Sequence, residues 1–116
     1  MFEDLRTYPS AIAKVQTQIL RLDGKIRKAQ QELDGYTTDI EQAIATDPDL
    51  KNDQQRKAKR LELMRDSKYV VLADALADAV DRRTRLEIEL QRHRNEFSVR
   101  KLEYRDHIAS KEAAVA

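Results

Sequence analysis

The chain has 116 residues, 37% of them charged, and its 22 Lys and Arg nearly balance its 21 Asp and Glu, which leaves a net charge of +1. This length fits one domain, and so small a net charge excludes a global field that would drive the protein onto DNA or an anionic membrane. The absence of cysteine excludes disulfides, thiolate catalysis and cysteine zinc sites, and we expect a cytoplasmic protein.

The composition favours long α-helices. The chain has only two Gly, two Pro and no Trp, and aromatic residues make up 5% of it. Abundant charge combined with strongly periodic apolar residues is typical of helices with solvated faces. We therefore expect an all-α protein. The longest apolar run, residues 69–73, is far too short to span a bilayer, so we expect no membrane contact.

A first long helix is predicted over residues 9–46. Pro9 suits the first helical turn, and Asp47 with Pro48 ends the helix. Its apolar residues alternate in spacing between four and three, which is the pattern of a coiled-coil seam. The predicted seam consists of Tyr8, Ile12, Val15, Ile19, Leu22, Ile26, Ala29, Leu33, Tyr36, Ile40 and Ala43.

Two glycines interrupt this first helix away from its seam. Gly24 and Gly35 each cost about 1 kcal/mol relative to alanine in a helix interior. They are either tolerated on an outer face or mark the close approach of a second helix.

A turn and a short helix follow over residues 47–65. Asn52 is a predicted N-cap, with Gln55 three residues further on as in a capping box. We expect the short helix over residues 53–65 to cap a hairpin. Its predicted buried stripe consists of Ala58, Leu61 and Met64, and its predicted solvent face consists of Arg56, Lys59 and Arg60.

The same segment carries the only marked local excess of charge. Residues 51–70 contain seven basic and three acidic side chains. Such a tip can bind phosphates with strong salt dependence and little sequence preference, or it can be an ordinary solvated helix. The candidate phosphate-binding residues are Lys51, Arg56, Lys57, Lys59, Arg60, Arg65 and Lys68.

A last long helix is predicted over residues 67–110, with a frayed tail over residues 111–116. Its predicted seam is partly polar and consists of Leu72, Leu76, Ala79, Arg83, Leu86, Leu90, His93, Phe97, Arg100, Tyr104 and His107. A second apolar set lies on another side of this helix, at Ile88, Val99 and Leu102. One helix with two apolar sides suggests two binding partners, one of which is the first helix of its own chain.

The two long helices are expected to form an antiparallel, coiled-coil-like hairpin that makes residues 1–116 a single domain. One seam gives marginal stability to so small a chain. We therefore predict a homodimer with a four-helix arrangement, or a helical protein partner. The candidate interface residues are Ile88, Phe97, Val99, Leu102 and Tyr104. The function predicted from this pattern is a non-enzymatic coiled-coil interaction or assembly module, and the alternative is an accessory protein that binds nucleic acid through the basic tip.

No catalytic, metal or cofactor site is predicted. Di-iron bundles use Glu-x-x-His, whereas this chain has Glu-x-x-x-His at Glu89 with His93 and at Glu103 with His107. The two histidines lie about 21 Å apart along one helix, so they cannot share a metal ion within one chain. Ion pairs or polar seam positions explain them better, and we expect no enzyme activity.

The segments LKNDQQRKA, residues 50–58, and FSVRKLEYR, residues 97–105, together give the chain a family resemblance. The chain resembles small helical proteins of unknown function that are encoded in bacteriophages and prokaryotic mobile elements. The resemblance covers mostly the second half of the chain. It implies an accessory role near DNA replication or recombination, and it assigns no role to any residue.

Overall fold

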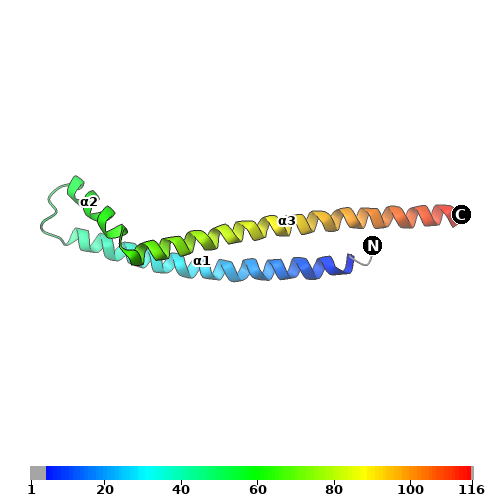
Figure 1. Cartoon of the computed structure of the whole chain (residues 1–116), viewed down its shortest axis with the longest axis horizontal. Helices are drawn as coiled ribbons and strands as arrows, with labels where there is room; N and C mark the ends of the chain where they lie inside the picture. The colour runs from blue at the N-terminus through cyan, green and yellow to red at the C-terminus, as the bar shows by residue number, and fades with distance from the viewer. Residues whose placement is uncertain (1–4, 116) are drawn as a thin grey trace. The chain divides into compact units, whose positions relative to one another are not determined.

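The computed structural model describes residues 5–115, which form three helices (Figure 1). These are α1 (Thr7–Ala45), α2 (Asp53–Met64) and α3 (Ser67–Val115). The described residues contain no strand, so the all-helical prediction with two long helices and one short helix is confirmed. None of these helices is both long and apolar enough to cross a membrane.

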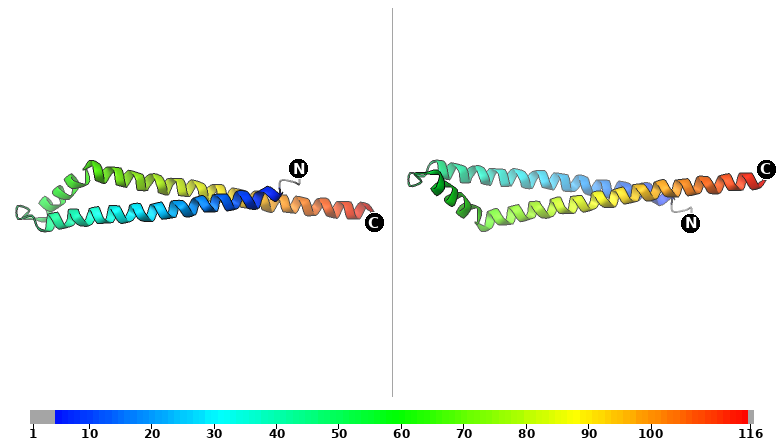
Figure 2. Two further views of the ribbon diagram at one scale, coloured as in Figure 1. Left: turned by 90° about the horizontal axis from the view of Figure 1, so that it is seen from below. Right: turned by 90° about the horizontal axis from the view of Figure 1, so that it is seen from above.

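The chain divides into two compact units. Unit 1 consists of Met1–Arg21 and Arg82–Ala116, and unit 2 consists of Leu22–Asp81. Each unit contains a part of α1 that pairs with an antiparallel part of α3, as Figures 1 and 2 show. The single domain over residues 1–116 stays a prediction.

The helix ends lie where local sequence signals place them. The Asn52 side chain accepts a hydrogen bond from the Gln55 backbone N–H at 2.8 Å, which confirms the predicted N-cap of α2. The Gln55 side chain in turn accepts from the Lys51 N–H at 2.7 Å. Asp66 accepts from the Lys68 N–H at 3.0 Å and caps α3, and this hydrogen bond lowers the pKa of the Asp66 carboxyl. α1 begins two residues before the predicted start and ends one residue before the predicted end.

In unit 1, the first part of α1 packs against the middle of α3. Val15 and Ile19 are buried, at 4% and 9% exposure. The rings of Tyr8 and Phe97 stack with centroids 5.5 Å apart. Arg100 donates a hydrogen bond to Glu103, and its interactions with the Tyr8 hydroxyl and with Glu103 raise the pKa of its guanidinium. The aromatic stack therefore lies at the start of the α1–α3 seam.

In unit 2, the seam continues and its last step differs from the prediction. Leu22 and Ile40 are buried as seam positions, but Ala43 is exposed and Ile44 is buried at 4% exposure. A straight helix has 3.6 residues per turn, so a strict seven-residue repeat drifts around its surface. After several heptads, that drift has moved the buried position by one residue.

The face of α2 that turns inward matches the predicted one only at Met64, which is half-buried. Ala58 is exposed and Leu61 is 50% exposed, whereas Lys59, Arg60 and Leu63 are half-buried. Arg60 binds Glu41 of α1 with two hydrogen bonds, and α2 lies between the end of α1 and the start of α3 (Figure 2). A bidentate arginine–carboxylate pair has a specific geometry. The Arg60–Glu41 pair therefore turns the Arg60 side of α2 toward α1.

α3 is longer than predicted, and α1 covers its seam only as far as Phe97. The helix continues to Val115 through a segment rich in alanine, a strong helix former. Ala116, the last residue of the predicted frayed tail, lies outside the described residues. Every described residue of α3 after Phe97 is exposed, including the predicted seam residues Arg100, Tyr104 and His107. The seam is lost there because Tyr8, which contacts Phe97, lies in the first turn of α1.

Candidate partner-binding surface

Large exposed apolar side chains gather on α3. In unit 1, Ile88 is 66% exposed, Val99 is 53% exposed and Leu102 is 58% exposed. Leucine, isoleucine and valine scattered singly on a surface need no explanation. Positions 88 and 99 are eleven residues apart, however, which is close to three full helical turns. These side chains therefore share one face of α3.

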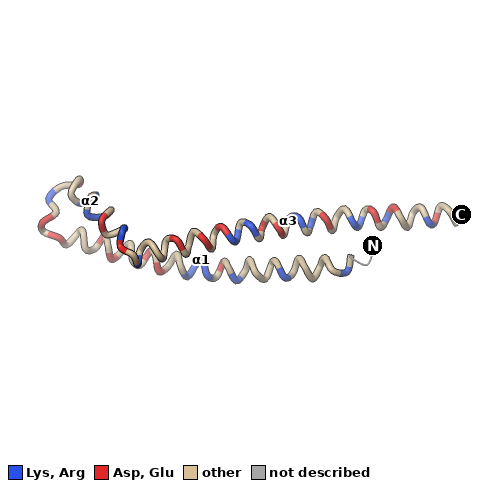
Figure 3. The backbone as a smooth tube through the Cα atoms, in the orientation of Figure 1, with Lys and Arg blue, Asp and Glu red and all other residues tan. Residues whose placement is uncertain are grey.

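This face is a continuous stripe without charge, which we call the outer stripe. It consists of Thr84, Ile88, Gln91, Asn95, Val99 and Leu102, all exposed and spaced by three or four residues. Charged residues surround it on both sides, and charges of both signs alternate along α3 (Figure 3). Within the stripe, the Gln91 amide donates to the Asn95 carbonyl oxygen at 3.0 Å. A neutral, half-apolar stripe on a highly charged helix is typical of a helix-packing surface.

Two of the five predicted interface residues lie on another side of α3. Phe97 is half-buried against Tyr8, and the Lys101 ammonium lies 4.5 Å from the Phe97 ring centroid. Tyr104 comes two turns later on the same side and is 40% exposed. The structure thus brings Ile88, Val99 and Leu102 together on one face and separates them from Phe97 and Tyr104.

The basic tip is partly neutralised within the chain. Arg60 pairs with Glu41, with 3.0 Å between Nη2 and Oε2, and the hydrogen bonds lower the pKa of the Glu41 carboxyl. Arg56 lies 3.0 Å from Asp53. Lys59 lies 3.6 Å from Glu62.

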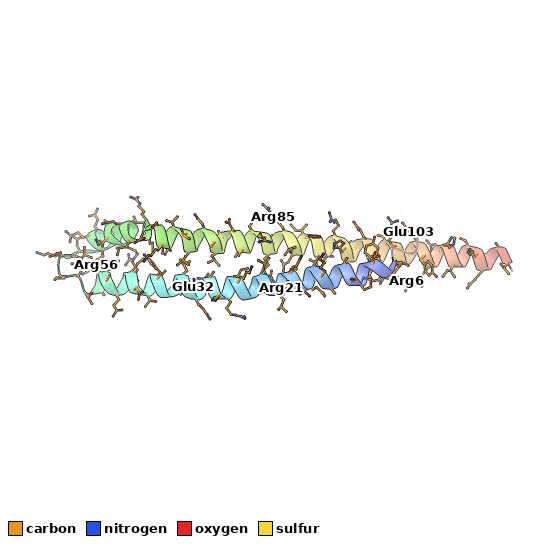
Figure 4. The ribbon with its side chains drawn as sticks, turned by 60° about the horizontal axis from the view of Figure 1, so that its bottom comes forward. Arg6, Arg21, Glu32, Arg56, Arg85 and Glu103 are labelled. Carbon is orange, nitrogen blue, oxygen red and sulfur yellow. The ribbon has the colours of Figure 1, made fainter. Side chains whose placement is uncertain are left out.

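The other predicted tip residues are Lys51, Lys57, Arg65 and Lys68, which are exposed and lie in or next to α2 (Figure 3). Arg56 also projects from this end of unit 2 in Figure 4. The tip is therefore a mixed-charge surface in which three of the seven cations contact carboxylates.

The titratable pairs on α3 are local. Glu89 lies 3.5 Å from His93, as the i,i+4 spacing predicts. Arg100 pairs with Glu103 at 3.0 Å, and Arg92 lies 4.0 Å from Glu96. Over residues 5–115, no group of three or more His, Asp or Glu side chains is placed to hold a metal ion.

Unit 2 also has a shallow apolar hollow of about 400 Å³, lined by Tyr36, Ser67, Lys68, Val71 and Leu72. Tyr36 lies beside Tyr69, with ring centroids 5.9 Å apart. Desolvation and the neighbouring Asp66 carboxylate raise the pKa of the Tyr36 hydroxyl. The lining is almost entirely apolar and lacks the convergent polar groups of a small-molecule site.

The polar members of the outer stripe were not predicted from the sequence. Thr84, Gln91 and Asn95 are not apolar, so a search for hydrophobic periodicity passes over them. Their signal is the lack of charge at every third or fourth position of a segment that is otherwise rich in Arg and Glu. Glu41 was not predicted either, because its partner Arg60 is 19 residues away.

Comparison of the chain with models of known protein families, with curated protein sequences and with solved structures finds no match. The resemblance to small helical proteins of bacteriophages and mobile elements therefore stays a prediction.

Proposed function

We propose that this protein is a non-enzymatic assembly module that binds a second copy of itself through the outer stripe of α3. The observation that carries this proposal is the exposure of Ile88, Val99 and Leu102, all more than half exposed, on one uncharged face. Burying such side chains against another helix is favourable by about 25 cal/mol for each Å² of apolar surface removed from water.

The total surface of the chain supports a partner. The chain exposes 9059 Å², whereas a compact monomer of 13.5 kDa exposes about 6,500 Å². The excess of about 2,500 Å² is larger than the surface of about 800 Å² that each partner buries in a standard interface. In addition, no described side chain is less than 2% exposed, so the chain by itself has little core.

The proposed dimer has a four-helix arrangement. In unit 1, α3 packs on α1 through its seam side, where Phe97 contacts Tyr8. The outer stripe lies on the opposite side of α3, so a partner docked there leaves the α1–α3 contact unchanged. The two α3 helices would then lie in the middle, each flanked by its own α1.

Light scattering at micromolar concentration tests the proposal, with Ile88, Val99 and Leu102 changed to Ser. Each side chain is about half exposed in the monomer, so its burial contributes about 1 kcal/mol. The six side chains of a dimer together make the dissociation constant more than a thousandfold larger in the variant. We expect a dimer for the native chain and a monomer of unchanged helicity for the variant.

The matched control is Leu20→Ser. Leu20 is 71% exposed and also belongs to unit 1, but it lies on α1, away from the outer stripe. This variant should remain a dimer. A native chain that is monomeric, or a triple-Ser variant that still dimerises, would overturn the proposal.

Nucleic-acid binding by the basic tip ranks second. Its support is the concentration of Lys and Arg in and around α2 (Figure 3). We place it second because Arg56, Lys59 and Arg60 contact carboxylates of the same chain, which reduces the charge that the tip offers to phosphates.

A further inference from the structure

We infer that the two α3 helices pack antiparallel in the dimer, about a two-fold axis that passes between residues 93 and 94, with Ile88 of each protomer against Val99 of the partner subunit. This inference rests on the proposed function, because it assumes that the outer stripe is the interface. It adds the direction and the register of the contact, which self-association alone leaves open.

The four middle residues of the outer stripe are arranged symmetrically, with two amides between two apolar side chains, whereas the two ends of the stripe differ. From one end to the other it runs through Thr84 and Ile88, then the amides of Gln91 and Asn95, then Val99 and Leu102. Two copies that run in opposite directions place Ile88 against Val99 of the partner subunit and Gln91 against Asn95 of the partner subunit. In a two-fold antiparallel contact, one residue meets a second residue of the partner subunit and the second meets the first, so apolar side chains face apolar side chains and amides face amides. A parallel contact pairs each residue with its own copy.

The amides in the middle can satisfy one another across the axis. Within one chain, Gln91 Nε2 donates to Asn95 Oδ1 at 3.0 Å. A side-chain amide has two donor hydrogens and a carbonyl oxygen with two lone pairs. Gln91 Oε1 can therefore accept from Nδ2 of the partner subunit's Asn95, and the same bond forms twice by symmetry. A polar pair at one level of an apolar interface is a known device for setting register.

The charges beside the stripe are complementary in the same register. Arg85 and Glu103 project from the side of α3 that is turned away from α1 (Figure 4). They lie 18 residues apart on one helix, or about 27 Å, so they cannot pair within a chain. In the antiparallel register, Arg85 comes level with the partner subunit's Glu103.

The charged pair nearest the axis is also complementary in this register. Arg92 and Glu96 are 4.0 Å apart within one chain, and the antiparallel register brings each of them level with the opposite charge of the partner subunit. On the other side of the stripe, Arg94 comes level with its own copy, and this like-charged contact opposes the contacts that Arg85 and Arg92 make with carboxylates. A parallel in-register dimer instead places Arg92 level with the partner subunit's Arg94 twice.

A distance measurement between two spin labels tests the direction. The chain has no cysteine, so Ser110→Cys carries a single label outside the outer stripe. An antiparallel dimer about an axis between residues 93 and 94 separates the two labels by roughly 50 Å along the helices, whereas a parallel dimer holds them within about 20 Å. We expect the long distance.

Disulfide formation tests the register separately. Ile88→Cys chains mixed with Val99→Cys chains should cross-link to each other on oxidation, because a disulfide needs Cα atoms within about 7 Å. Each variant alone should remain uncross-linked, since identical positions lie about 17 Å apart in this register. The opposite pattern, in which Ile88→Cys links to itself, would overturn the inference.

The outcomes separate this inference from the proposed function. A dimer with a short label distance refutes the antiparallel register and leaves self-assembly intact. A long label distance without mixed cross-linking refutes the pairing of Ile88 with Val99. If light scattering shows a monomer and the spin labels give no distance, both the antiparallel register and the proposed self-association are refuted.

Discussion

Replacing Gly24 and Gly35 with alanine should stabilise the protein. Both glycines lie inside α1 and neither has a positive φ angle, so alanine can adopt the same backbone conformation. A Cβ atom built at either position meets no atom within 4 Å. The substitutions therefore introduce no clash, and only the difference in helix propensity remains.

That difference is about 0.8–1 kcal/mol for each glycine in a helix interior. The two sites are eleven residues apart, about 16 Å along the helix, so their effects should add. Gly24→Ala with Gly35→Ala should raise the free energy of unfolding by about 1.5–2 kcal/mol, and the melting temperature by roughly 10 °C.

Urea unfolding followed by far-ultraviolet circular dichroism measures this change. The midpoint should rise and the slope of the transition should stay the same. Ala77→Gly is the matched control, because Ala77 is exposed inside α3 and belongs to the same unit as both glycines; it should lower the stability by about 1 kcal/mol. If the control has its expected effect and the double variant is no more stable than the native chain, the reasoning is refuted, and the glycine face contacts another helix.

Two further predictions concern contacts within each unit. Arg60 lowers the pKa of Glu41, so this pair contributes stability above the unfolded pKa of about 4.3 and loses it as the pH falls through the lower folded value. The urea midpoint of the native chain should accordingly fall more steeply below pH 4 than that of Glu41→Gln, and equal slopes would contradict the role of the pair. Tyr8→Ala removes the stack on Phe97 and should lower the free energy of unfolding by about 1 kcal/mol, with faster amide exchange in the first turns of α1; unchanged exchange would show that the stack does not hold this end.

Local signals placed the helices well, because helix starts and ends depend on neighbouring residues. Pro9, the Asp47–Pro48 pair and the Asn52 cap all act within one helical turn. The apolar spacing of the first helix also predicted four of its buried residues, Val15, Ile19, Leu22 and Ile40. Each of these features can be predicted from a few consecutive residues or from the regular spacing of the apolar residues.

The candidate site was harder to predict because it depends on what each side of α3 contacts. Phe97 and Val99 are two residues apart and both apolar, yet Phe97 is covered by Tyr8 while Val99 is 53% exposed. Periodicity shows that they lie on different sides of a helix. It does not show which side the first helix covers or where that cover stops.

Three helices, the N-cap of the short helix and most of the seam of the first helix could be predicted from the sequence alone, because they follow from contacts within a turn or from a regular period. Tertiary packing sets the burial of Ile44 in place of Ala43, the contact of Arg60 with Glu41 and the exposure of the outer stripe of α3. These features depend on the drift of straight helices over many turns and on contacts between residues far apart in the chain.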